Sequence, residues 1–137
     1  MDKFIFGLEL DVRDYELDSE GIVNNANYLH YLEHTRHAFC KHAGYSFAQM
    51  EADGITPVLS RVEIDYKKPL KSGDTMVSKL WVEGKGVRFI FHQTIFHKDS
   101  GDIAVKADVS VVTLEGGKLS RGEKLFNAFK DYLEPNP

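Results

Sequence analysis

The architecture of this chain follows from residues 18–28, DSEGIVNNANY, where a polar loop leads into a helix. Asn24 or Asn25 can cap that helix, because a short polar side chain accepts from the free N–H groups of a first turn. Gly44 stands where a helix C-terminus favours glycine. An apolar stripe lies between these ends, with Leu29, Arg36 and Cys40 beside it: Tyr28, Leu32, Thr35, Phe39 and Ala43. The spacing of four and three predicts one long helix with a single buried face.

Alternation of apolar and polar residues dominates the rest of the chain. Each alternating segment is predicted to be a half-buried strand. These segments are 4–13, 58–66, 75–83, 87–97 and 103–114. Gly84-Lys85-Gly86 is predicted to be a tight hairpin turn, and short turns of this kind imply antiparallel pairing. Short helical segments are expected at 46–52 and 125–133, and residues 14–21 are predicted to be a polar loop.

These elements predict an α+β fold, with an antiparallel sheet of about five strands against one long helix. The length of 137 residues fits a single domain, 1–137. The helix covers only part of one sheet face, and exposed sheet edges aggregate unless they are paired. We therefore expect self-association.

Composition argues against several classes of function. The net charge is −4, from 17 Lys plus Arg against 21 Asp plus Glu, whereas nucleic-acid binding needs a concentrated basic face. No apolar run is long enough for a membrane-spanning helix, and residues 1–4 do not begin like a signal peptide. Cys40 is the single cysteine, so no internal disulfide or cysteine metal cluster is expected. These features predict a cytoplasmic protein without a nucleic-acid partner.

A carboxylate lies a few residues before the predicted helix, close enough in the sequence to act together with the N-terminus of that helix. Asp18 lies on a glycine-containing loop a few residues before the helix N-terminus. That terminus offers unpaired N–H groups and a partial positive charge, which stabilise an oxyanion. A nearby carboxylate could activate water or attack a carbonyl carbon directly. The alternative is that Asp18 is only a loop charge favoured by the helix dipole.

This stretch resembles the 4-hydroxybenzoyl-CoA thioesterase branch of the hotdog-fold superfamily. The family pattern is Asp-x-x-Gly-(Ile/Val)-Val, four variable residues and Tyr, followed on the helix by an acidic residue and an Arg. The matching residues are Asp18, Gly21, Ile22, Val23, Tyr28, Glu33 and Arg36. Asn24-Asn25 also resembles the acyl-ACP thioesterases, but Ile22 replaces their His and Glu20 replaces an Asn. Residues 56–57 and 62–74 resemble the second strand and following turn of hotdog thioesterases.

The resemblance implies an acyl-CoA thioesterase that hydrolyses an acyl thioester to free acid and coenzyme A. Asp18 would be the catalytic carboxylate, as nucleophile or general base, and the backbone N–H of Asn25 would polarise the thioester carbonyl. Gly21, Val23 and Tyr28 would contribute to substrate binding. The substrate would be an acyl-CoA or an acyl-carrier-protein thioester, with no cofactor beyond it.

The resemblance also places the active site at a subunit interface, which implies a homodimer or homotetramer. Coenzyme A carries phosphates, so basic residues should surround its binding site. Lys85 and Arg88 are the best candidates by family position. The other basic residues considered are Lys67, Lys68, Lys71 and Arg121.

The sequence is also compatible with other sites and functions. His30 to His34 matches the H-x-x-E-H spacing of certain zinc peptidases, but a solvated or interfacial histidine face that includes His37 is favoured, with no metal. Glu33 is expected to partner Arg36 or another subunit. Cys40 lies on the apolar stripe and is predicted to be a core residue rather than a nucleophile. The rival functions are a hotdog dehydratase or hydratase and a non-catalytic acyl-CoA binding module.

Overall fold

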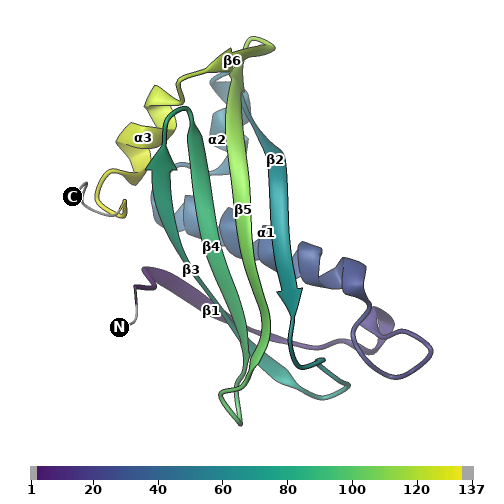
Figure 1. Cartoon of the computed structure of the whole chain (residues 1–137). Coiled ribbons are helices and arrows are strands. Elements are labelled where there is room, and N and C mark those ends of the chain that lie inside the picture. Colours follow the sequence, from purple (N-terminus) through teal and green to yellow (C-terminus); the bar gives the residue numbers. More distant parts are fainter. Residues whose placement is uncertain (1–2, 134–137) are drawn as a thin grey trace.

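The computed structural model describes residues 3–133, and its strands curl around one long helix (Figure 1). The strands are β1 (Phe6–Asp11), β2 (Ile55–Tyr66), β3 (Thr75–Lys85), β4 (Arg88–His97), β5 (Ile103–Glu115) and β6 (Lys118–Ser120). The helices are α1 (Asn25–His42), α2 (Phe47–Ala52) and α3 (Glu123–Phe129), with a short 3-10 turn, η1 (Asp14–Glu16). The predicted α+β class is confirmed.

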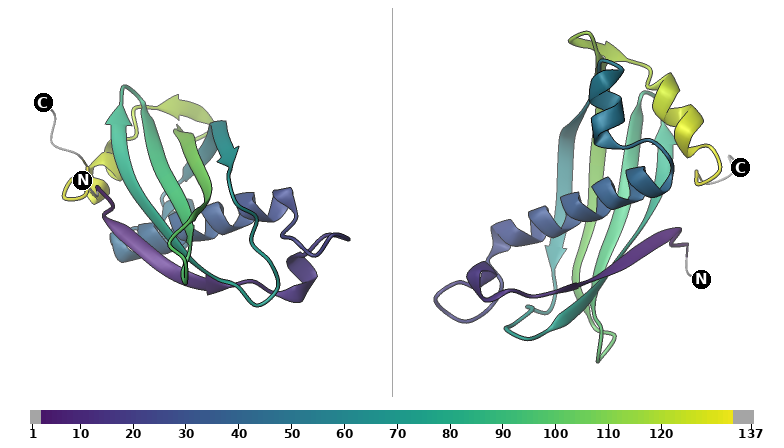
Figure 2. Two further views of the ribbon diagram at one scale, coloured as in Figure 1. Left: turned by 60° about the horizontal axis from the view of Figure 1, so that its bottom comes forward. Right: turned by 180° about the vertical axis from the view of Figure 1, so that it is seen from behind.

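The sheet is antiparallel, with strand order β1-β3-β4-β5-β2, and β6 pairs with β5. Figure 2 shows α1 running across one face of this sheet, with α2 and α3 near the end that carries the β3–β4 hairpin. β1 and β2 are therefore the outer strands of the main path. The core lies between α1 and the inner sheet face.

The predicted apolar stripe of α1 is largely buried. Leu32 and Phe39 are fully buried, and the hydroxyls of Thr35 and Ser78 meet at 2.7 Å beneath the helix. Tyr31, outside the predicted stripe, is buried as well. Leu29 is an exception, because 41% of it is exposed. The apolar face predicted for the helix and the apolar faces predicted for the strands thus pack against each other in one core.

Several predicted boundaries were wrong. Gly84 belongs to β3 rather than to the hairpin turn, and a Cβ there would overlap the ring of Phe126 on α3. The turn is Gly86–Val87, with Gly86 at φ +63°, and Lys85 pairs with Arg88 across it. Gly84 is needed because α3 packs closely against β3 at this position. The spacing of residues in the sequence does not reveal such a contact.

The C-terminal part also differs in detail from the prediction. α3 ends at Phe129, although a helix was expected to reach residue 133, and Leu133 instead forms a bridge with Val82. The short strand β6 was not predicted. β2 begins at Ile55, three residues before the expected start. Among residues 3–133 there is no helix whose length and apolarity would allow it to cross a membrane.

Candidate active site

The loop before α1 is a closed hairpin organised by Asp18. Its N–H donates to the carbonyl of Ile22 at 2.8 Å, and the N–H of Gly21 donates to the carbonyl of Asp18 at 3.1 Å. The carboxylate oxygen Oδ1 of Asp18 accepts from the N–H groups of Glu20 at 2.8 Å and Ile22 at 3.4 Å. Gly21 has φ +81°, which a side chain would strain. The half-buried Asp18 carboxylate is thereby fixed in direction, and its Oδ2 has no hydrogen bond to residues 3–133.

The N–H of Asn25, in the first turn of α1, is open. Asn24 is the cap, as its side chain accepts from the N–H of Ala26 at 2.9 Å, and its carbonyl accepts from the N–H of Asn27. Asn25 is exposed, and within the described part of the chain its N–H has no acceptor. An unpaired N–H at the positive end of an 18-residue helix is suited to bind an oxyanion.

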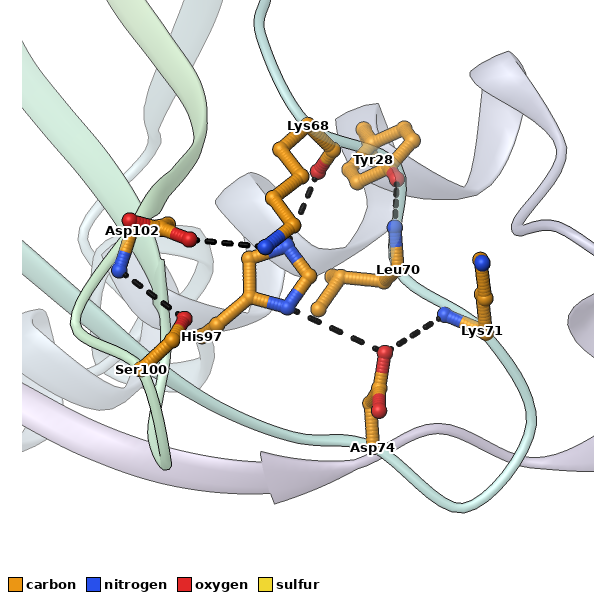
Figure 3. Close-up of polar contacts among 8 residues, drawn as sticks. All are labelled: Tyr28, Lys68, Leu70, Lys71, Asp74, His97, Ser100 and Asp102. Carbon is orange, nitrogen blue, oxygen red and sulfur yellow. Dashed lines mark hydrogen bonds and ion pairs between the residues drawn. The ribbon is translucent and has the colours of Figure 1, made fainter.

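Tyr28 and Val23 bind the loop and the helix to the segment 67–74. The Tyr28 hydroxyl accepts from the N–H of Leu70 at 2.9 Å (Figure 3). The N–H of Val23 donates to the carbonyl of Leu70 at 2.9 Å. Both side chains are buried, at 3% and 1% exposure. Burial raises the pKa of the Tyr28 phenol, so its hydroxyl keeps its proton. In the single chain these two residues hold the loop against the segment 67–74.

A second set of contacts holds the same segment from the sheet side (Figure 3). Nε2 of the buried His97 lies 3.0 Å from the carbonyl of Lys68, and its Nδ1 lies 3.8 Å from Asp74. Asp74 accepts from the N–H of Lys71 at 2.8 Å, and the ammonium of Lys68 pairs with Asp102 at 2.7 Å. The segment 67–74 is therefore fixed between α1 and the β4–β5 turn.

Glu16 anchors the loop and was missed by the sequence analysis, which predicted a polar loop there. It is 5% exposed, and its carboxylate accepts from Arg13 Nη2 at 2.7 Å, from Arg13 Nε at 3.2 Å and from the Tyr31 hydroxyl at 2.8 Å. Its carbonyl accepts from the N–H of Asn24 and the side chain of Asn27. Burial acts to raise the pKa of Glu16, but the hydrogen bonds from Arg13 and Tyr31 outweigh it and lower that pKa overall.

An apolar cavity of about 100 Å³ lies between the helices and the inner face of the sheet. Apolar side chains from every element around it form most of the wall. They are Cys40, Phe47, Met50, Pro57, Leu59, Phe89, Phe91, Val111, Leu125 and Phe129. Cys40 is 3% exposed, which confirms it as a core residue, and this burial raises the pKa of its thiol to about 12.

One charged side chain in this cavity wall is buried. Arg36 is 8% exposed, and its Nη1 donates to Oε1 of Gln93 at 3.0 Å. Gln93 is fixed in turn by the carbonyl of Leu32, which accepts from its Nε2 at 3.0 Å. Glu33 also lines this cavity, but it is exposed and makes no ion pair with Arg36 within 4.0 Å in the described residues. The expected Glu33–Arg36 partnership is replaced by a contact with a neutral amide.

The basic residues proposed for coenzyme A lie far from Asp18 within one chain. Lys85 and Arg88 are exposed at the hairpin, while Ile22 pairs with Lys71, just before the other end of β3. β3 has 11 residues, and at about 3.3 Å of rise per residue its two ends lie roughly 33 Å apart. Lys85 and Arg88 could approach Asp18 only across a subunit interface.

The helical histidines are not gathered around a common point. His30 and His34 are exposed, whereas the ring of His37 packs on Phe47 with centroids 3.7 Å apart. Burial lowers the pKa of His37. Residues 3–133 contain no group of three His, Cys, Asp or Glu side chains arranged to hold a metal ion.

Comparison with known proteins agrees with this architecture. The model of the thioesterase-like superfamily matches residues 12–125. YneP of Bacillus subtilis, whose name proposes acyl-CoA thioesterase activity, is 34% identical over 108 residues, covering 78% of each chain. The long-chain acyl-CoA thioesterase FadM of Escherichia coli is 31% identical over 109 residues, covering 78% of this chain and 81% of FadM.

A solved structure shows the same fold. The 1,4-dihydroxy-2-naphthoyl-CoA thioesterase of Synechocystis superimposes with a TM-score of 0.84 over 95% of this chain and 98% of that one, at 18% identity. The curled antiparallel sheet around one long helix is thus the hotdog arrangement that the resemblance implied.

Proposed function

Because this chain belongs to the thioesterase-like superfamily of hotdog-fold thioester hydrolases, we propose that it hydrolyses acyl-CoA thioesters with Asp18 and the N-terminus of α1. The observation that carries the proposal is the pairing of two open groups. The Asp18 carboxylate is fixed by its own loop but keeps one oxygen free, and the N–H of Asn25 has no acceptor in residues 3–133. A base and an oxyanion donor are the two groups that thioester hydrolysis needs.

The reaction uses these groups at the thioester carbon. Asp18 removes a proton from water while the water oxygen bonds to that carbon, or its carboxylate attacks the carbon and water later hydrolyses the resulting anhydride. The carbonyl oxygen becomes an oxyanion and accepts from the N–H of Asn25. The C–S bond then breaks, and coenzyme A leaves as a thiolate that takes up a proton. The products are a carboxylic acid and coenzyme A.

The supporting residues have separate tasks in this proposal. Gly21 permits the turn that directs Asp18, while Val23 and Tyr28 hold the loop against residues 67–74. The cavity beside Arg36 receives the far end of the acyl group, because it is apolar and lies against α1.

The complete site requires a second copy of the chain. β2 is a 12-residue strand at one end of the main sheet path, and it carries the exposed apolar residues Val58, Leu59 and Tyr66. An open apolar edge of this kind favours pairing with another strand, and a twofold dimer is the commonest closed assembly. Such a pairing would let Lys85 and Arg88 of one subunit serve the site of the other.

The test is to incubate the protein with acyl-CoA thioesters of several lengths, aromatic acyl groups included. Hydrolysis is measured as the release of free coenzyme A thiol. Asp18→Asn should fold normally and lose about 10²-fold or more in kcat, because loss of a positioned base or nucleophile costs that much. Glu20→Gln is the matched control, since this carboxylate lies on the same loop but is exposed. A well-folded Asp18→Asn variant with unchanged turnover would remove Asp18 from the mechanism.

A further inference from the structure

The guanidinium of Arg36 has an unused edge in a cavity whose wall is mostly apolar, with Glu33 and His37 as its other polar side chains. An arginine presents Nε and one terminal nitrogen side by side, a geometry that matches the two oxygens of a carboxylate. In Arg36, Nη1 is engaged by Gln93, and Nε and Nη2 make no hydrogen bond to the residues that the structure describes. The side chain is 8% exposed and lines the cavity.

Arg13 shows how the same edge is filled elsewhere in this chain. Its Nε and Nη2 both donate to Oε2 of Glu16, at 3.2 and 2.7 Å. Arg13 is half exposed, so water could have solvated it without a partner. Arg36 is buried, where desolvation makes a missing partner far more costly, yet it lacks the carboxylate that Arg13 has.

The neighbouring charged groups do not supply that partner. Glu33 is exposed but also lines this cavity, and its charge acts to raise the pKa of Arg36 and of His37. It forms no ion pair with either side chain within 4.0 Å among the described residues. His37 packs on Phe47, and burial lowers its pKa, so it is not a competing cation near neutral pH. Arg36 is therefore the buried charge of the cavity wall, while the second charge on that wall, Glu33, is exposed.

We propose that Arg36 selects acyl groups whose far end carries a hydrogen-bond acceptor, with a carboxylate preferred over a methyl group. This inference rests on the proposed placement of the acyl group in the cavity. A volume of about 100 Å³ is less than the roughly 150 Å³ cavity that binds benzene, so the cavity holds the end of an acyl group rather than a whole long chain.

The experiment varies the length of the acyl group, because the thioester site and the cavity that share one acyl group can belong to the same subunit or to two subunits. Arg36 lies eleven residues after Asn25, which is roughly 16 Å along the helix axis. The substrates should therefore be straight-chain acyl-CoA thioesters up to that span, prepared in pairs of equal length. One member of each pair ends in a methyl group and the other in a carboxylate.

The quantity to measure is kcat/KM for the carboxylate-ended substrate divided by that for its methyl-ended partner. Wild-type protein should give a ratio above one at the favoured length, and Arg36→Met should lower the ratio about tenfold or more, as expected for a lost charge-assisted hydrogen bond. Arg36→Lys, which keeps the charge but not the planar fork, should lie between them. Lys41→Met is the matched control, because Lys41 is an exposed cation on α1 outside the cavity.

Two results would overturn the inference. One is a wild type that does not prefer carboxylate ends at any length. The other is an Arg36→Met variant, folded by circular dichroism, in which both members of each pair change equally. If the wild type hydrolyses none of these thioesters, the proposed reaction fails, and calorimetric binding of the same pairs then decides whether Arg36 still distinguishes their ends.

Discussion

Two arginine clusters in this molecule differ in whether the guanidinium has a carboxylate partner. The Arg13 cluster has one and is complete, whereas the Arg36 cluster has none among the described residues and is open. Beneath the loop before α1, Arg13 and the hydroxyl of Tyr31 donate to the buried carboxylate of Glu16. In the cavity, the one hydrogen-bond partner of buried Arg36 among residues 3–133 is the neutral amide of Gln93. A completed cluster fixes backbone, as Glu16 does by also binding Asn24 and Asn27. A buried charge with an open edge contributes little to folding, and this is why we assign it to a ligand.

The largest expected effect on stability comes from the completed cluster. Glu16→Gln keeps the shape but removes the charge that Arg13 and Tyr31 engage, and should cost about 1–2 kcal/mol of unfolding free energy. That range is reduced for solvent screening because Arg13 is half exposed. Urea unfolding near neutral pH measures it, with Glu20→Gln as the control. Equal stability of the two variants would contradict a structural role for Glu16.

The same variant carries a pH signature. The pKa of Glu16 is lowered on folding, so the ionised carboxylate stabilises the protein at pH values above its unfolded pKa, near 4.5. That stabilisation is lost as the pH falls through the lower pKa of the folded state. The difference between wild type and Glu16→Gln should therefore shrink as the pH falls below about 4.5. A difference that grows in acid would reverse the direction assigned to this pKa.

Lys85 and Arg88 give a smaller effect, because these cations are exposed. Replacing both with Ala should raise the KM for acyl-CoA about fivefold, since exposed ion-pair contacts with phosphate are each worth about 0.5 kcal/mol. An acyl-pantetheine thioester without the nucleotide should be less affected. Equal effects on both substrates would make these residues ordinary surface charges and redirect the search to Lys67, Lys68, Lys71 or Arg121.

The smallest expected change in stability is that of the open cluster. Arg36→Met removes a buried charge that has only a partial partner, and such replacements are often neutral or stabilising. Its unfolding free energy should stay within about 1 kcal/mol of wild type. A loss of about 3 kcal/mol or more, typical of breaking a buried pair, would show that Arg36 is a structural residue like Glu16.

The contrast between the clusters also explains what could be predicted from the sequence. The stripe through Leu32 and Phe39 and the alternating strands predicted the helix and the sheet, because local spacing determines which face is buried. The helix start was predicted for the same local reason, whereas the catalytic role of Asp18 was predicted only from the family resemblance. Glu16 looked like an ordinary loop carboxylate, because its burial depends on Arg13 and on Tyr31, fifteen residues away.

The cavity and its arginine could not be predicted in this way. Arg36 was recognised only as part of a motif, with Glu33 as the expected partner. Its partner Gln93 lies 57 residues away on β4, and the cavity is lined from several strands and helices at once. Only the packing of these elements shows that one edge of the guanidinium is left without a partner.

Binding of a ketone analogue tests most directly whether the thioester carbonyl binds at the N-terminus of α1. In this analogue a methylene replaces the thioester sulfur of acyl-CoA, so the carbonyl binds but is not hydrolysed. Backbone amide NMR spectra recorded during its titration should show the resonance of Asn25 among the largest shifts, together with those of the loop that carries Asp18. If the analogue saturates the protein while the Asn25 amide and the Asp18 loop remain unshifted, the carbonyl binds elsewhere and the proposed site is wrong.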